Sequence, residues 1–338
     1  MVSLPKPRLA IVALTAVLAV VSFTIVPPIK AHAATTSPYT LSSRQLHVGF
    51  ASDGSIQSLK VAGDTFDTQY VMNPDVAPDQ GKEPKAKYRQ WLGNVMFSYA
   101  TGTGAVSEHG VGTRPWKSAW TTSSADSRKV TRSADGKTIT VTYKPSSDAN
   151  GIKKFTFTET YRLAADGSLT WQQKVTNTSG QRLVIGDWGV PLPDNELWKG
   201  GDEIYETRVL SHSYVGKNGS YVTIGRPSGQ GPSLLFTPDT ATGSGFEYQD
   251  RWRTEEVGNT PWAWNQDHEG SNIKGLNVYY VHSKAIQKTN RGYLPSTSLS
   301  LSRGASRTYT FHIGKVNSDQ DVKDSLYHQG LLDTTVVP

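Results

Sequence analysis

Two segments of the chain concentrate side chains that could recognise or cleave a sugar. The first runs from Gly186 to Tyr221 and the second from Glu247 to Glu269, and both interleave aromatic rings with carboxylates, arginines and amides. The apolar face of a pyranose stacks on an aromatic ring, while its hydroxyls need directional polar partners. The two segments therefore predict a carbohydrate-binding surface, although the same composition also suits a protein interface.

The candidate ligand contacts in these segments are mainly aromatic: Trp188, Trp198, Tyr205, Tyr214, Trp252, Glu255, Trp262 and Trp264. Trp188 lies between Gly186 and Gly189, so a buried plug at a strand end is an equal alternative for it. A preceding proline and a following polar run favour an exposed loop around Trp262 and Trp264. Glu255 could instead pair with the arginines beside Trp252 and have a structural role.

Catalysis by two carboxylates requires them to converge across a glycosidic bond, about 5 Å apart for retention and about 6.5–9.5 Å for inversion. Glu255 and Glu256 fail this test on a strand, because adjacent side chains point to opposite faces. Glu203 could meet a second carboxylate only through tertiary structure. Glu203 and His212 are the candidates for acid–base chemistry, and a structural histidine is the alternative for His212.

Other kinds of chemistry find little support in the sequence. Asp267-His268-Glu269 lacks the histidine spacing of a metalloprotease helix and is typical of a solvated loop, so no metal is expected. There is no dinucleotide fingerprint, phosphate loop, nucleophile elbow or cysteine, and no cofactor is expected. The basic residues are scattered, which argues against a nucleic-acid partner.

The elements that must position these residues are predicted to be strands. Apolar residues recur two apart, as in Phe155, Phe157 and Tyr161, and Asp-Gly pairs at 53, 135 and 166 separate such runs. With 36% hydrophobic and 19% charged residues, the chain can bury a large core. No linker or repeat divides the body. We predict an all-β fold, a large two-sheet antiparallel β-sandwich over residues 35–317.

One short helix is predicted at the C-terminal end. Ser318 can cap it, Asp321 follows three residues later as in a capping box, and Gly330 is a suitable stop. Residues 331–338 are then extended, as in a linker that is cut short, so 318–338 is expected to be a helix followed by a truncated linker.

The first 34 residues predict a secretory signal peptide and hence a secreted, extracellular protein. Lys6 and Arg8 precede an uncharged run from Leu9 to Val26, which ends in prolines and a small-residue cleavage site at 31–33. The run approaches the length that spans a bilayer, so an uncleaved anchor is the less favoured alternative. After cleavage no stable membrane span is expected, and the net charge falls from +6 to +3 because three basic residues are removed.

Six short sequences together resemble an uncharacterised family of secreted proteins similar to six-hairpin glycosidases. They are Gly-Asp-Trp-Gly-Val-Pro-Leu-Pro (186–193), Gly-Asp-Glu-Ile-Tyr-Glu-Thr-Arg-Val (201–209), Arg-Pro-Ser-Gly-Gln-Gly-Pro (226–232), Gly-Phe-Glu-Tyr-Gln-Asp-Arg-Trp-Arg (245–253), Gly-Leu-Asn-Val-Tyr-Tyr-Val-His-Ser (275–283) and Asn-Arg-Gly-Tyr-Leu-Pro (290–295). The resemblance implies an N-terminal supersandwich like that of galactose mutarotase, followed by a helical (α/α)6 toroid with the active site. It assigns no catalytic residue to a position here.

The resemblance therefore leads us to expect the carbohydrate-binding or scaffolding part of a polysaccharide-degrading enzyme. Its partners would be a polysaccharide or oligosaccharide and a helical toroid that is absent from this chain, and the chain alone is expected to lack hydrolytic activity. A free-standing mutarotase-like enzyme or glycosidase is the first alternative, and it requires His212 or another histidine to converge with a glutamate. A non-sugar interaction module at the cell surface is the second.

Overall fold

The structure is a computed structural model that describes residues 37–71, 92–102, 117–121, 127–146, 151–196, 204–216, 219–252, 276–283 and 298–331. Seventeen β-strands form in these ranges, and every strand pairing is antiparallel. The predicted large antiparallel sandwich with one C-terminal helix is confirmed. The predicted signal peptide and residues 332–338 lie outside the described residues.

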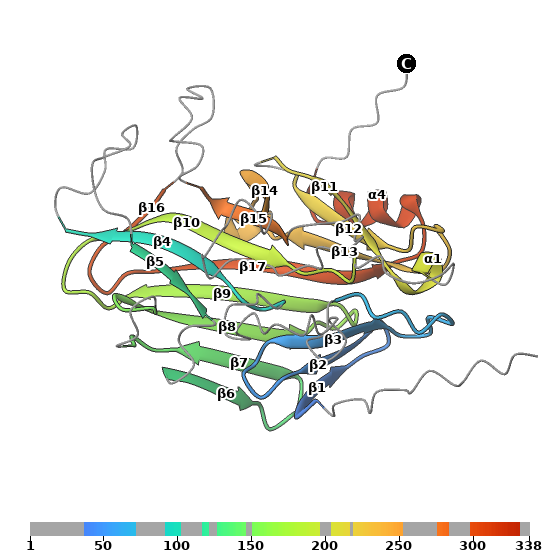
Figure 1. Ribbon diagram of the computed structural model, residues 1–338, viewed down its shortest axis with the longest axis horizontal. Helices are drawn as coiled ribbons and strands as arrows, with labels where there is room; N and C mark the ends of the chain where they lie inside the picture. Colours follow the sequence, from blue (N-terminus) through green and yellow to red (C-terminus); the bar gives the residue numbers. More distant parts are fainter. Residues whose placement is uncertain are drawn as a thin grey trace, which may run out of the picture. The chain divides into compact units, whose positions relative to one another are not determined.

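The largest sheet has eight strands (Figure 1). In spatial order they are β11 (Leu210–Tyr214), β12 (Tyr221–Gly225), β13 (Ser233–Pro238), β17 (Ser306–Val316), β9 (Leu169–Asn177), β8 (Phe155–Leu163), β7 (Thr138–Tyr143) and β6 (Arg128–Arg132). The central β17 lies between β13 and β9, and so joins the strands β11 to β13 to the meander of β6 to β9.

Two smaller sheets complete the sandwich. The six-stranded sheet contains β14 (Tyr248–Trp252), β15 (Leu276–His282), β10 (Leu183–Leu192), β4 (Met96–Thr101) and β5 (Lys117–Trp120), with β16 (Leu299–Leu301) also paired to β10. The three-stranded sheet contains β1 (Tyr39–Ser42), β2 (Leu46–Phe50) and β3 (Ile56–Val61). This third sheet is an addition to the two sheets that the sequence predicts.

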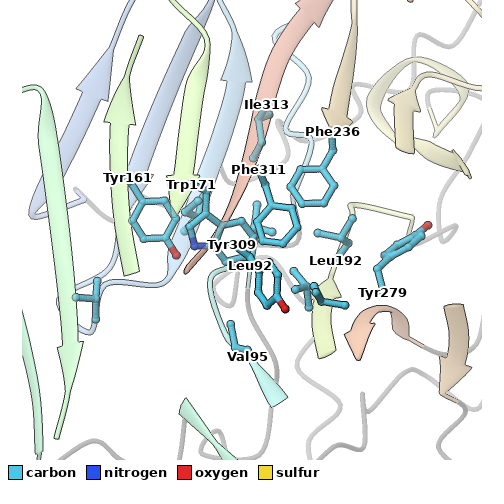
Figure 2. Close-up of a cluster of buried hydrophobic side chains, with 14 of the residues drawn as sticks. Leu92, Val95, Tyr161, Trp171, Leu192, Phe236, Tyr279, Tyr309, Phe311 and Ile313 are labelled. Carbon is cyan, nitrogen blue, oxygen red and sulfur yellow. The ribbon is translucent and has the colours of Figure 1, made fainter. Parts of the chain in front are cut away.

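Aromatic rings from facing sheets form the core. The ring centroids of Phe97 on β4 and Phe157 on β8 are 5.1 Å apart. This contact joins the six-stranded sheet to the eight-stranded one. The ring centroids of Phe50 on β2 and Tyr161 on β8 are also 5.1 Å apart, and this contact joins the three-stranded sheet to β8. Figure 2 shows the layer continuing through Trp171 and Phe311. The period-two spacing of apolar residues places these rings on one face, as the sequence predicts.

Two polar residues also point into this core. Glu159 on β8 and Gln173 on β9 face each other in the strand register and are fully buried. Glu159 accepts hydrogen bonds from Tyr143, Tyr161 and Trp171, at 3.1 to 3.3 Å. Gln173 reaches across to the six-stranded sheet instead. Buried polar groups need such partners because desolvation is costly.

The predicted Asp-Gly turns are present, and they share one arrangement. Gly54, Gly136 and Gly167 have φ angles of 85°, 70° and 93°, a region that glycine occupies without strain. In each turn the aspartate carboxylate accepts a hydrogen bond from the backbone N–H two residues later. These local interactions explain why a two-residue sequence signal located three turns.

The predicted helix is α4 (Asp319–His328). The Ser318 hydroxyl accepts a hydrogen bond from the N–H of Asp321, as a helix N-cap should, and Gly330 takes a φ of 69° beyond the end. Leu326 is the buried residue that anchors the helix. Among the described residues, no helix has the length and apolarity to cross a bilayer.

Candidate functional site

The structure places Trp188 in the core. Its side chain is 0% exposed and packs edge-on against Phe97 and Tyr309, with ring centroids 5.3 and 4.9 Å apart. Its indole N–H donates to the Gln173 side chain at 2.7 Å, which ties the two large sheets together. Of the two alternatives that the sequence left open for Trp188, the structure therefore shows the buried plug. The side chain offers no surface for a sugar to stack on.

Three of the predicted site residues are exposed, one on helix α1 and two on strand β11. Tyr205 is 50% exposed on the short helix α1 (Ile204–Thr207), and Tyr214 is 55% exposed on the edge strand β11. The Tyr214 ring stacks on Tyr221, with centroids 6.3 Å apart. His212 is also exposed on β11. Tyr205 and Tyr214 therefore remain available as sugar contacts.

His212 is turned away from the buried carboxylate that bonds its neighbour Ser211. Ser211 donates its hydroxyl to Glu196 at 2.6 Å, and adjacent residues on a strand face opposite ways. Glu196 and Asp194 are both buried, and burial together with the charge of Glu196 holds the pKa of Asp194 well above its usual range. This cluster links β10 to β11, and His212 lies on the other face of that strand.

The other predicted site residues lie in parts of the chain that the structure does not describe. Trp198, Glu203, Glu255, Trp262 and Trp264 lie outside the described residues, as does the side chain of Trp252, whose backbone pairs with Leu276. Asp267-His268-Glu269 falls there too. Across the described ranges, no three His, Asp or Glu side chains are grouped as a metal site would require.

A different set of polar and charged side chains lines a pocket of about 300 Å³. Its walls come from the turn at residues 240–247, the end of β15 and the start of β17. Four of the lining residues carry reactive or charged groups: Glu247, His282, Arg307 and Tyr309. We call this cavity the acid–base pocket.

A histidine and a tyrosine are directly bonded in this pocket. His282 Nε2 and the Tyr309 hydroxyl lie 2.6 Å apart, and either can donate depending on the histidine tautomer. Burial raises the pKa of Tyr309, Arg307 acts against that rise, and Glu247 adds to it. The hydroxyl therefore keeps its proton at neutral pH. A protonated hydroxyl bonded to imidazole can pass a proton to or from a ligand.

Arg307 and Glu247 place opposite charges in the same pocket. The Arg307 guanidinium lies 4.7 Å from the centre of the Tyr309 ring and donates to the carbonyl of Thr242 at 3.1 Å. Glu247 accepts a hydrogen bond from the N–H of Ser283 at 2.6 Å, which places its carboxylate beside the end of β15. The pocket thus offers both a cation and an anion to a polar ligand.

The turn that carries Glu247 is fixed to β17. The hydroxyl of Ser244 accepts a hydrogen bond from the N–H of Thr310 at 2.9 Å. Gly243 has a φ of 68°, and a Cβ there would lie 2.7 Å from the Arg307 guanidinium. Glycine is needed at this position because a side chain would both strain the backbone and displace Arg307.

Sequence reasoning did not single out this constellation. Glu247 only marked the start of an aromatic segment, and His282 only fell within one of the sequences that carry the resemblance. The available signal was that residues 245–253 and 275–283, two sequences that carry the family resemblance, both border the pocket. Nothing local indicated that they meet β17.

Comparison with known proteins fits this architecture. A family of unknown function (DUF5695) matches residues 95–338. The chain belongs to this family. No curated protein matches the sequence significantly. A solved polysaccharide lyase shares the fold, with 17% identity and a TM-score of 0.56 over 86% of this DUF5695 chain and 35% of the lyase.

Two further solved structures cover nearly their whole length. An aldose epimerase homologue from C. elegans has 11% identity and a TM-score of 0.48, over 82% of this chain and 98% of its own. A galactose mutarotase-like protein from Clostridium acetobutylicum has 10% identity and a TM-score of 0.45, over 82% and 95%. The DUF5695 chain spans about a third of the length of the lyase. The lyase, which has the highest TM-score of the three, shows a shared fold and no more.

Proposed function

We propose that this DUF5695 protein is a secreted carbohydrate-binding β-sandwich, the binding or scaffolding part of a glycoside-hydrolase-like protein that degrades polysaccharide. The acid–base pocket is its sugar site. The observation that carries this is the convergence of Glu247, Arg307 and the Tyr309 hydroxyl around about 300 Å³. Sites for small ligands are concave and contain a few well-placed polar groups on an otherwise apolar wall.

Each group in the pocket has a partner on a sugar. A carboxylate accepts hydrogen bonds from sugar hydroxyls, and a guanidinium donates to ring and hydroxyl oxygens. Val281 and Phe246 supply the apolar wall. The exposed Tyr214 on β11 would extend the surface for a longer chain, together with the predicted contacts Trp198, Trp252, Glu255, Trp262 and Trp264.

Export and a helical partner domain complete this proposal. The signal peptide over residues 1–34 would deliver the sandwich outside the cell, and a helical toroid would supply the hydrolytic site. Mass spectrometry of protein secreted by its host is expected to find an N-terminus near residue 35. A mature protein that keeps the Leu9–Val26 run would instead be membrane-anchored.

Sugar binding is tested with the purified chain on a polysaccharide array that scores binding and reducing-end release in the same wells. The variant Glu247→Gln keeps an oxygen for the Ser283 N–H but removes the charge, and we expect it to weaken binding about tenfold or more. The control Asp319→Asn removes one exposed carboxylate from α4 and is expected to bind as the wild type does.

The variant Tyr214→Ala separates the two surfaces. If it abolishes binding while Glu247→Gln does not, the sugar site is on β11 and the pocket assignment is wrong. If the wild-type chain binds no glycan on the array, the sandwich has another role, such as a docking face for a protein partner.

A second function is favoured by one observation about the pocket. His282 and Glu247 line the same pocket, which is the histidine–glutamate convergence that a free-standing mutarotase-like enzyme or glycosidase requires. Release in the array, or faster exchange of sugar anomers by NMR, would support it. Tyr309→Phe is then expected to lower that rate about a hundredfold, and the exposed Tyr327→Phe to leave it unchanged.

A further inference from the structure

A second cavity, on a different part of the sandwich, is lined by cations. It is a groove of about 720 Å³ between the β1–β2 turn, the β6–β7 turn and the end of β8. Four basic side chains line it, and all four are exposed: Arg44, Arg132, Lys137 and Arg162. We call it the basic groove.

The positive charge of the basic groove is only partly offset by the surrounding chain, through the charge of Asp135 beside Lys137 and Arg162. None of its four basic residues forms an ion pair within 4.0 Å in the part of the chain that the structure describes. Its one acidic lining residue, Asp135, accepts hydrogen bonds from Ser133 and from the N–H of Lys137, so its carboxylate is engaged in the hairpin turn. A groove with three net positive charges attracts an anionic ligand.

The walls of the basic groove are tied together. The hydroxyl of Ser43 donates to the carbonyl of Gly167 at 2.5 Å, and Arg44 Nε donates to the carbonyl of Asp166 at 3.0 Å. The N–H of Leu163 donates to the carbonyl of Lys137 at 3.2 Å. These bonds hold three separate turns in place, so the cations need little reorganisation to receive a ligand.

The lining indicates the kind of anion. It contains no aromatic side chain, which single-stranded nucleic acid would need for base stacking. It does contain the hydroxyls of Thr40 and Ser42, which suit a hydroxyl-rich chain. Three of the four cations are arginines, whose planar fork matches the oxygens of carboxylate and sulfate groups.

We propose that the basic groove binds a polysaccharide whose sugar units carry an oxyanion, carboxylate or sulfate. This rests on the proposed function in that the ligand is a glycan, but it involves a different surface from the acid–base pocket. Such a protein selects acidic polysaccharides over neutral ones.

The test is isothermal titration of the full chain with polygalacturonate, with carrageenan and with neutral dextran. We expect binding to one or both acidic polymers, weakened about tenfold or more in Lys137→Gln/Arg162→Gln. The matched control Lys174→Gln/Arg303→Gln removes the same two kinds of charge from exposed sites outside the groove and is expected to bind as the wild type does. Polygalacturonate carries only carboxylates and carrageenan only sulfates, so the two arms identify the oxyanion.

Three results would overturn the assignment of the basic groove. The first is binding of an acidic polymer that the control pair weakens as much as the groove pair, since this would show only a net-charge effect. The second is duplex DNA that displaces the acidic polymer with equal affinity, which would make the groove a nucleic-acid surface. Binding of neutral glycans that Glu247→Gln removes, with no binding of acidic polymers, would refute the groove but leave the sugar pocket standing.

Discussion

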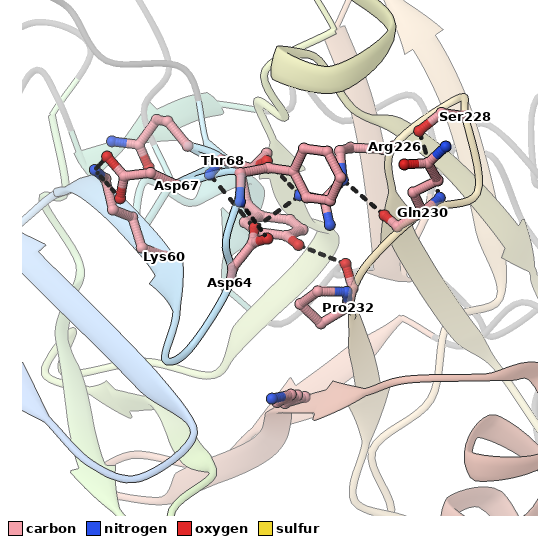
Figure 3. A network of polar contacts seen from close by, with 12 residues as sticks. Lys60, Asp64, Asp67, Thr68, Arg226, Ser228, Gln230 and Pro232 are labelled. Carbon is pink, nitrogen blue, oxygen red and sulfur yellow. Dashed lines mark hydrogen bonds and ion pairs between the residues drawn. The ribbon is translucent and has the colours of Figure 1, made fainter.

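Replacing Arg226 with methionine is expected to lower the free energy of unfolding by about 3–5 kcal/mol. Arg226 Nη1 donates to Asp64 at 2.7 Å and also to the hydroxyl of Thr68, while Nε donates to the carbonyl of Gln230 at 2.7 Å (Figure 3). Its guanidinium also lies 4.3 Å from the centre of the Phe66 ring. The arginine thereby joins the loop after β3 to the β12–β13 turn.

The large effect follows from burial. The side chains of Arg226 and Asp64 are 0% and 1% exposed, so methionine would leave a carboxylate buried without its cation. Burial acts to raise the pKa of Asp64, but the hydrogen bond and charge of Arg226 and the backbone N–H of Phe66 lower it overall. The charged pair is therefore the stable form at neutral pH.

Urea unfolding followed by tryptophan fluorescence measures this loss. The control is Lys60→Met, which breaks an ion pair of similar length whose side chains are 34% and 79% exposed, and it should cost less than about 1 kcal/mol. The double variant Asp64→Asn/Arg226→Met should recover part of the loss, because no charge then stays buried alone. Equal losses of unfolding free energy in Arg226→Met and Lys60→Met would show that burial does not set the cost of breaking the ion pair.

Local sequence signals predicted the local structure well. Period-two spacing placed Phe155, Phe157 and Tyr161 on one face, and the same parity puts Glu159 with them, although its charge argued for the surface. Asp-Gly pairs located the turns because the aspartate carboxylate accepts a hydrogen bond from the backbone N–H two residues later. In each case the sequence pattern that identifies the structure spans only a few residues.

The candidate site could not be predicted in the same way. Glu247, His282 and Tyr309 come from a turn and two strands that belong to different sheets, so no spacing reveals their contact. The sequence predicted that His212 could act in acid–base chemistry. On β11, however, its side chain points to the opposite face from Ser211, which bonds the buried carboxylate of Glu196. Convergence across sheets depends on register and on a bulge beside Trp188, which composition does not encode.

The buried Glu159 is expected to make the protein less stable as pH rises. Burial raises the pKa of Glu159 to about 8, against the hydrogen bonds from Trp171, Tyr161 and Tyr143. In the unfolded chain the pKa is about 4.3. Between these values the folded state holds a proton that the unfolded state has lost, so the free energy of unfolding falls by about 1.4 kcal/mol per pH unit. Above about pH 8 both states are ionised and the dependence ends.

Glu159→Gln should remove this dependence. The neutral amide cannot ionise, and Gln173, directly opposite on β9, shows that the core accommodates a glutamine there. Relative to the wild type, the variant should gain up to about 4 kcal/mol between pH 5 and pH 8, because only the wild type must keep a carboxyl protonated. Urea unfolding of both proteins across this range gives the difference, in which the other titrating groups cancel. A difference that does not change with pH would show that Glu159 is ionised throughout, held by its three hydrogen bonds.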